Sequence, residues 1–295
     1  MSDQDNVDIP AGLIGPESFP GRLDDGLFGP HSLTWRVYAD PSAQIGMVAA
    51  VLMQALNPNM MRLFTEVSAN SRDAAGRAAR TGQYILTTVF ADSAHAEAAG
   101  AMVRRQHAHA KWTDPTTGET LEAEKPAWLA WTHNCLIWGV LRACDAFGPA
   151  LTTAEQDQLV VEQLVSARLV GLNPDDLPAT RAALDAYIDE QKDWMAMTLP
   201  AAESTASLRR PKLWGNPVTI IPGLFIQDAI IALLPQWAQM LYGLDSRHMH
   251  PRLATAGTRA ALNAARRSKS YEQVLRESLT EAQAHPYARV KSAAP

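Results

Sequence analysis

Apolar residues recur every three or four positions along most of the chain, whereas runs that alternate apolar and polar residues are almost absent. This spacing gathers the apolar side chains on one face of a helix, so it predicts an all-α protein built around one core. The predicted helices cover residues 42–56, 59–66, 74–90, 94–110, 127–147, 154–170, 179–199, 224–241 and 251–267, with a further amphipathic segment at 271–283.

Cap and turn residues mark the boundaries between these helices. Asp92 and Thr152 each stand directly before a helical pattern, and Glu155 completes a capping box with Thr152. The turn cluster at 114–118 predicts a two-stranded hairpin. The predicted organisation is an N-terminal arm, a single helical domain and a C-terminal tail, at residues 1–30, 31–285 and 286–295.

The composition is typical of a cytoplasmic globular protein. The 295 residues are 47% hydrophobic, enough for a large core, and a net charge of −5 without any basic run argues against nucleic-acid binding. Cys135 and Cys144 are nine residues apart in one predicted helix, which places them on opposite sides and beyond disulfide reach. Unbridged thiols and the lack of a secretory signal predict a cytoplasmic location.

Two apolar segments, 43–61 and 218–244, approach the length of a membrane span. A span needs about 20 consecutive apolar residues, whereas polar residues and prolines interrupt both segments. We therefore expect buried core helices here, with peripheral membrane contact as the alternative.

A polar stripe lies on one of the predicted helices. Arg77, Arg80, Thr81 and Tyr84 follow the i, i+3, i+4, i+7 spacing that places side chains on one helix face. Buried arginines require anionic partners, and the arginine fork binds carboxylates at two points, so a ligand carboxylate is one candidate partner. The alternatives are a structural network of salt bridges, with Asp73 nearby, and a solvated surface.

Two histidines lie on apolar faces of predicted helices. His107 shares its face with Gly100 and Val103, whose small side chains would let a flat group approach closely. His133 shares its face with Ile137 and Val140. Each histidine alone is typical of a core residue bonded to the backbone, and each is also a candidate for ligand binding.

Other catalytic chemistry finds little support in the sequence. The spacings of zinc sites, nucleophile elbows, dinucleotide-binding loops and P-loops are absent. Several further histidines are expected on the surface or in loops: His95, His109, His248, His250 and His285.

Short motifs then appear in a characteristic order. They are Gly26-Leu-Phe-Gly29-Pro30, Thr34-Trp35-Arg36-Val37, Arg77-x-x-Arg80-Thr81-x-x-Tyr84, Val103-Arg-Arg-Gln-His107, Trp131-Thr-His133, Leu177-Pro178-x-Thr180 and Tyr187. In this order they resemble the haem-dependent oxygenase family that includes the latex-clearing rubber oxygenases and the mycophenolic-acid-pathway oxygenase. The similarity covers roughly residues 25–245.

The resemblance implies an α-helical core of globin-like character that holds haem b. It implies one histidine as the iron ligand, with His107 as the first candidate and His133 as the alternative. A neutral imidazole is a standard haem ligand, which agrees with the apolar faces that carry both residues.

The same resemblance suggests roles for the polar stripe. Arg80 and Thr81 would donate hydrogen bonds to bound oxygen or position the substrate, and Arg77 would pair with a haem propionate. Tyr84 would contact the cofactor.

Two positions depart from the family pattern. Asn57 stands where relatives usually carry His before Pro58, and Arg80 stands where the rubber enzymes carry Lys. Arginine stays charged, so we expect that Arg80 does not ligate iron and that the sixth coordination position is open or filled by water.

The implied function is a haem b-dependent oxygenase that oxidises or cleaves a hydrophobic small molecule with molecular oxygen. A lipid, terpenoid or secondary metabolite is a more suitable substrate than polyisoprene, because no export signal is visible. The alternatives are a non-enzymatic helical protein that binds haem or lipid, and a peroxidase-like haem enzyme.

Overall fold

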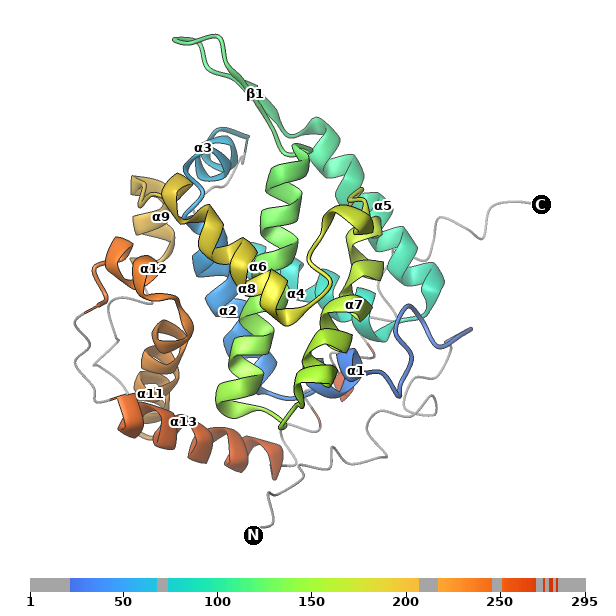
Figure 1. Ribbon diagram of the computed structural model, residues 1–295, viewed down its shortest axis with the longest axis vertical. Helices are drawn as coiled ribbons and strands as arrows, with labels where there is room; N and C mark the ends of the chain where they lie inside the picture. Colours follow the sequence, from blue (N-terminus) through green and yellow to red (C-terminus); the bar gives the residue numbers. More distant parts are fainter. Residues whose placement is uncertain are drawn as a thin grey trace.

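The computed structural model describes residues 22–67, 74–206, 217–245 and 251–268, together with four further residues between 273 and 280. The described chain is helical apart from one short hairpin, which confirms the all-α prediction. Figure 1 shows the helices arranged around a central pair, α2 (Ser42–Ala55) and α6 (Pro126–Phe147). The other elements are α1 (Leu33–Tyr38), α3 (Pro58–Val67), α4 (Ala74–Phe90), α5 (Ser93–His109), β1 (Lys111–Thr113), β2 (Thr120–Glu122), α7 (Thr153–Leu169), η3 (Pro174–Asp176), α8 (Arg181–Glu190), η4 (Gln191–Trp194), α9 (Leu199–Ser204), α11 (Pro217–Leu233), α12 (Gln236–Leu241) and α13 (Pro251–Arg266).

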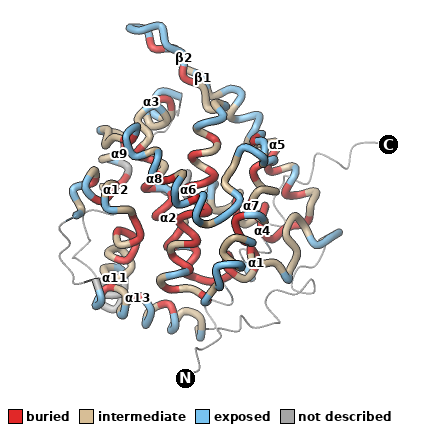
Figure 2. Tube along the Cα trace, in the orientation of Figure 1, coloured by how far each residue is buried: buried red, intermediate tan, exposed pale blue. Residues whose placement is uncertain are grey.

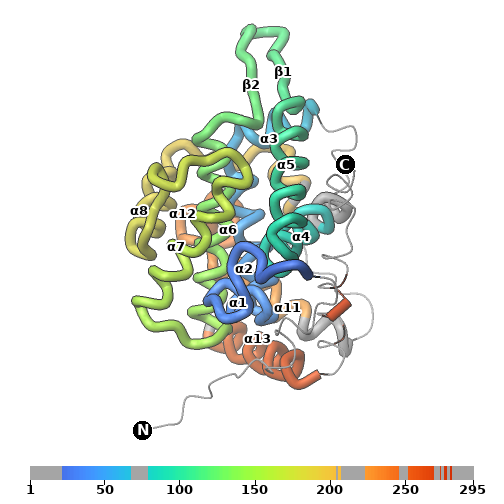
Figure 3. Tube along the Cα trace, turned by 90° about the vertical axis from the view of Figure 1, so that its right-hand side faces the viewer, coloured from blue at the N-terminus to red at the C-terminus, as the bar shows by residue number. Residues whose placement is uncertain are grey.

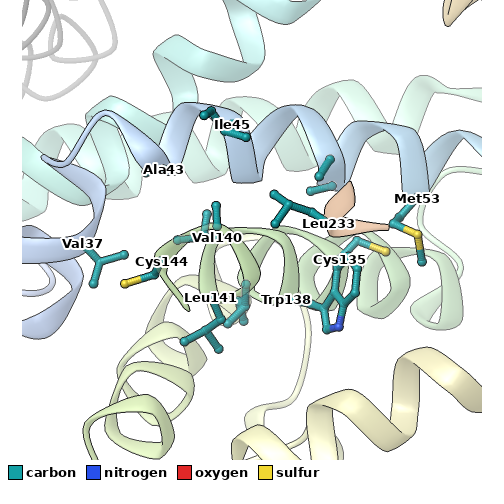
Figure 4. Packing of buried hydrophobic residues seen from close by; sticks show 14 of the residues in the cluster. Val37, Ala43, Ile45, Met53, Cys135, Trp138, Val140, Leu141, Cys144 and Leu233 are labelled. Atoms are coloured by element: carbon teal, nitrogen blue, oxygen red, sulfur yellow. The ribbon is translucent and has the colours of Figure 1, made fainter. Parts of the chain in front are cut away.

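Two glycines let α2 and α6 approach each other closely. A Cβ atom on Gly46 would lie 2.5 Å from the carbonyl oxygen of Gly139, so the two backbones are nearly in contact. Apolar side chains from both helices surround this crossing, as Figure 4 shows for part of the cluster. Buried positions concentrate on the same two helices (Figure 2). The α2–α6 pair is therefore the centre of the core.

One main hydrophobic cluster extends from Trp35 in α1 to Leu262 in α13. A smaller satellite cluster joins Leu129 of α6 to Ala167 and Leu172 at the C-terminal end of α7. The described chain therefore has one core with an extension toward the end of α7.

Most of the predicted helix boundaries are confirmed. The Thr152 hydroxyl accepts a hydrogen bond from the Glu155 backbone, and the Glu155 carboxylate accepts one from the Thr152 backbone at 2.8 Å, which completes the capping box of α7. The Asp92 carboxylate caps α5 by accepting from the backbone of His95. Cys135 and Cys144 are both buried and unbridged, as their spacing predicted.

The predicted hairpin also forms, and it projects beyond the helices (Figure 3). Its strands are antiparallel, with Trp112 opposite Leu121. Arg62 of α3 holds the hairpin, because its guanidinium lies 2.8 Å from the Asp114 carboxylate and 4.8 Å from the centre of the Trp112 ring.

Two predictions about the helices were wrong, and one short helix was missed. The helix expected at 179–199 divides into α8, η4 and α9, because Thr198 caps a separate short helix after an extended residue, Met195. The helix expected at 224–241 divides at Pro235, whose ring nitrogen has no hydrogen to donate. The short helix α1 was not predicted, and it depends on a distant residue: the Glu162 carboxylate of α7 accepts the backbone N–H of Thr34 at 2.8 Å.

The described part of the N-terminal arm packs against the turn between α4 and α5. The backbone N–H of Leu23 donates to the Asp92 carboxylate at 3.3 Å, and the Asp24 carboxylate accepts the backbone N–H of Ser93 at 2.8 Å. The expected segment at 271–283 lies almost entirely outside the described residues. Within the described ranges, no helix is both long enough and apolar enough to cross a membrane.

Candidate functional site

His133 lies in the interior of α6 with 9% of its surface exposed. Burial lowers the pKa of its imidazole to about 4, so the ring is neutral at physiological pH. Its Nε2 atom is buried and has no hydrogen-bond partner among the described residues. Leaving a buried polar atom unpaired costs about 1–3 kcal/mol, so this nitrogen is a candidate contact for a bound group.

His107 lies in the last turn of α5 and is half-buried. Burial lowers the pKa of this histidine, and the nearby negative charge of Glu124 opposes the shift. Its Nδ1 atom is buried without a hydrogen-bond partner in the described part of the chain. Both predicted histidines therefore carry one ring nitrogen that the described protein leaves unpaired.

The face of α5 that carries His107 packs against the C-terminal end of α7. A Cβ atom on Gly100 would lie 2.9 Å from the Leu169 side chain, and the Arg104 guanidinium donates a hydrogen bond to the Leu169 carbonyl oxygen. His107 follows on the same face, seven residues after Gly100. The expectation that this small-residue face admits a flat ligand is wrong at Gly100, because Leu169 fills that space.

The face of α6 that carries His133 meets the same end of α7. Leu129 packs against Ala167 in the satellite cluster, and His133 follows Leu129 by one helical turn. The candidate region thus comprises two helix faces, that of α5 with His107 and that of α6 with His133, which both border the C-terminal end of α7.

The polar stripe lies on α4, which contacts α5 and is joined to it by a turn at residues 91–92 (Figure 3). Counting outward from this turn, Arg80 and Arg77 are as many residues along α4 as Val103 and Gln106 are along α5. Arg77, Arg80 and His107 therefore all lie in the halves of these helices that are farther from the turn.

The stripe is not buried by the described chain. Arg80 and Thr81 are exposed and Tyr84 is half-buried, whereas the side chain of Arg77 lies outside the described residues. The described part of the stripe therefore lies at or near the surface of the described chain. The catalytic roles expected for Arg77, Arg80 and Thr81 stay predictions.

An open hollow of about 560 Å³ occupies another face of α5. Its lining residues are Met102, Arg105, Gln106 and His109. These residues lie on the helix face opposite His107, at about 100° per residue. His109 is exposed, as predicted, and its Nδ1 lies 2.6 Å from the Arg105 carbonyl oxygen. The hollow is therefore separate from the candidate region.

His95 differs from the prediction that placed it at the surface. It is buried in α5, where its Nδ1 lies 2.7 Å from the carboxylate of Asp92. The helix-capping carboxylate holds the imidazole inward, which the sequence pattern did not reveal. The predicted positions of His248, His250 and His285 lie outside the described residues.

Tyr187, the last of the ordered motif residues, contacts α6 on a different face from His133. It hydrogen-bonds with Asn134, and burial raises the pKa of its hydroxyl to about 12. Asn134 was not singled out from the sequence, where its position next to His133 is the only feature that marks it.

Within the described ranges, no three His, Cys, Asp or Glu side chains are grouped so that they would hold a metal ion by themselves.

The fold and these side chains define an all-α protein with two neutral imidazoles, each of which keeps one ring nitrogen unpaired in the described part of the chain. Comparison with protein-family models matches residues 35–267 to the family described as ER-bound oxygenase mpaB/B′/Rubber oxygenase, catalytic domain. The match spans most of the chain, so the chain belongs to this family of oxygenase catalytic domains and is an enzyme of the oxidoreductase class. No curated protein and no solved structure gave a significant match.

Proposed function

We propose that the protein is a haem b-dependent oxygenase that oxidises or cleaves a hydrophobic small molecule with molecular oxygen. The observation that carries this proposal is the pair of unpartnered ring nitrogens, His107 Nδ1 and His133 Nε2, within an oxygenase catalytic domain. Iron binds the neutral form of imidazole, and burial favours that form at both residues.

The residues present fit a haem group. His107 is the proposed iron ligand, because its Nδ1 is unpaired within the described residues and its side chain, in the last turn of α5, is partly accessible. His133 is the alternative ligand. When bound, haem iron supplies the binding and activation of oxygen.

The polar stripe would supply the charged and hydrogen-bonding groups of the proposed site. Arg77 would pair with a haem propionate, since a guanidinium binds a carboxylate at two points. Arg80 and Thr81 would donate hydrogen bonds that orient the reactants, and Tyr84 would contact the cofactor. An arginine side chain offers N–H donors and no acceptor, so Arg80 would act as a hydrogen-bond donor and not as an iron ligand.

The apolar surroundings of His133 support a hydrophobic substrate. Its helix neighbours Leu129, Ile137 and Val140 are all buried. Surroundings of this kind exclude water and favour apolar groups by the hydrophobic effect.

The ligand assignment is tested by absorption spectra after expression with added haem. The wild type is expected to show a Soret band that His107→Ala removes or strongly weakens and that His133→Ala retains. His109→Ala is the matched control, because His109 lies two residues along the same helix and is exposed. Loss of the band only in His133→Ala overturns the choice of His107, and a wild type without the band overturns the haem proposal.

A further inference from the structure

Two large apolar side chains project into solvent where the chain passes from α8 to α9. Trp194, the last residue of η4, is 77% exposed, and Leu199, the first residue of α9, is 73% exposed. A single exposed apolar residue is common on protein surfaces, whereas two of this size within six positions form an apolar patch. Such a patch marks a surface where a partner binds.

The residues between these two side chains anchor the segment to the core. Met195 is buried, and Met197 packs against the main hydrophobic cluster. The backbone N–H of Ala196 donates to the carbonyl oxygen of Leu56, at the end of α2, at 2.9 Å. The Thr198 hydroxyl then caps α9. The core therefore holds the segment in a fixed position that presents both apolar side chains outward.

A third exposed apolar residue lies on a neighbouring element. Met240 of α12 is 60% exposed, and α12 contains no charged residue. The Tyr242 hydroxyl, just beyond α12, donates to the Leu52 carbonyl oxygen at 2.6 Å, one helical turn before the carbonyl group that holds the α8–α9 segment. Helices α9 and α12 accordingly lie on the same side of the molecule (Figure 1). We call the three exposed residues the apolar edge: Trp194, Leu199 and Met240.

The charged groups beside the apolar edge are mainly acidic. Between positions 189 and 203 the chain carries four carboxylates and one amine, all of them on exposed residues. The amine is that of Lys192, which lies 3.1 Å from the carboxylate of Asp189. This excess of negative charge repels an anionic surface, so the apolar edge is suited to a surface without net charge.

A lipid surface fits the apolar edge better than a protein partner does. A stable protein interface buries about 800 Å² on each side, and its core is depleted of Asp and Glu. A tryptophan offers only about 150–250 Å², and acidic residues flank this one. A bilayer surface accepts single projecting side chains without a matching shape, and it favours tryptophan because the ring is apolar and its N–H is polar.

We propose that the apolar edge inserts into the surface of a zwitterionic phospholipid bilayer, so that the protein binds membranes peripherally. Trp194 and Leu199 enter the boundary between headgroups and acyl chains, while the flanking carboxylates stay in water. This inference is independent of the proposed function, because it uses neither the two histidines nor the polar stripe.

The test places an environment-sensitive nitrobenzoxadiazole dye on Leu199→Cys in the full-length protein. Cys135 and Cys144 are buried, so the dye is directed to the new cysteine. Titration with phosphatidylcholine vesicles to millimolar lipid is expected to raise the dye emission severalfold and shift it to shorter wavelength. Adding Trp194→Ala is expected to raise the lipid concentration at half response about tenfold.

Leu253→Cys is the matched control, because Leu253 is 58% exposed and lies on α13, away from the apolar edge. The dye at this position is expected to stay in water and to give no response. Circular dichroism checks that each variant folds, and Met240→Cys carries the dye if Leu199→Cys does not.

The opposite results overturn the inference. No response at the apolar edge excludes insertion, and an equal response from Leu253→Cys assigns the signal to unspecific adsorption. Stronger binding to vesicles that contain phosphatidylserine contradicts the choice of a zwitterionic surface. A dye response that grows with protein concentration in the absence of lipid shows that a second copy of the chain covers the apolar edge instead.

Discussion

The imidazole of His133 lies in α6 among apolar neighbours, and burial lowers its pKa to about 4. Burial also lowers the pKa of His107, but this side chain is only half-buried, and the negative charge of Glu124 opposes the shift. The sequence pattern predicted that both histidines lie on apolar helix faces. It did not predict that each keeps an unpaired nitrogen, because the partners of a buried side chain come from elements far away in the chain.

The low pKa of His133 makes stability depend on pH. In the unfolded chain the pKa is near 6.5, so between pH 6.5 and 4 the unfolded state binds a proton that the folded state does not. The free energy of unfolding therefore falls as pH falls through this window, by about 3 kcal/mol in total. Urea denaturation of the protein without haem, from pH 7 to pH 4, measures this loss.

His133→Gln is expected to remove most of that pH dependence, because glutamine does not titrate. His109→Gln is expected to leave it in place, since His109 is exposed. Equal pH dependence in the wild type and in His133→Gln would assign the loss to other groups and contradict a buried neutral imidazole.

At the scale of elements, local signals were sufficient wherever a cap or turn residue acts on its own neighbours. The capping box at Thr152 and the cap at Asp92 both formed as the sequence indicated. Local sequence signals were not sufficient where a distant contact decides the structure. Glu162 of α7 is an example, because its carboxylate accepts a backbone N–H at the start of α1. The burial of His95 has a local cause, its bond to Asp92, but apolar periodicity does not record such bonds.

The crossing of α2 and α6 gives a prediction at this scale. Gly46→Ala is expected to destabilise the protein by about 1–3 kcal/mol, because the new Cβ would meet the backbone of Gly139 at 2.5 Å and the helices would have to separate. Gly82→Ala in α4 is the control: no atom lies within 4 Å of its added Cβ, so alanine is expected to be neutral or stabilising there. Denaturation midpoints provide the measurement, and equal effects in the two variants would contradict the close crossing.

At the scale of the whole molecule, long-range ion pairs tie the helices to one another. The Arg266 guanidinium of α13 donates to both carboxylate oxygens of Asp40 at 2.8 Å and to the carbonyl oxygen of Phe147. This contact joins the C-terminal helix to the start of α2 and the end of α6. The sequence predicted a single core from its apolar periodicity, but it contained no sign of partners 226 positions apart.

Haem b as the oxygen-activating cofactor of this helical domain is tested by a pyridine haemochrome assay on protein purified after expression with added haem. Haem b is expected at about one molecule per chain, the stoichiometry that a single iron-ligating histidine would give. Protein that is folded and free of haem under these conditions would show that the domain does not use this cofactor.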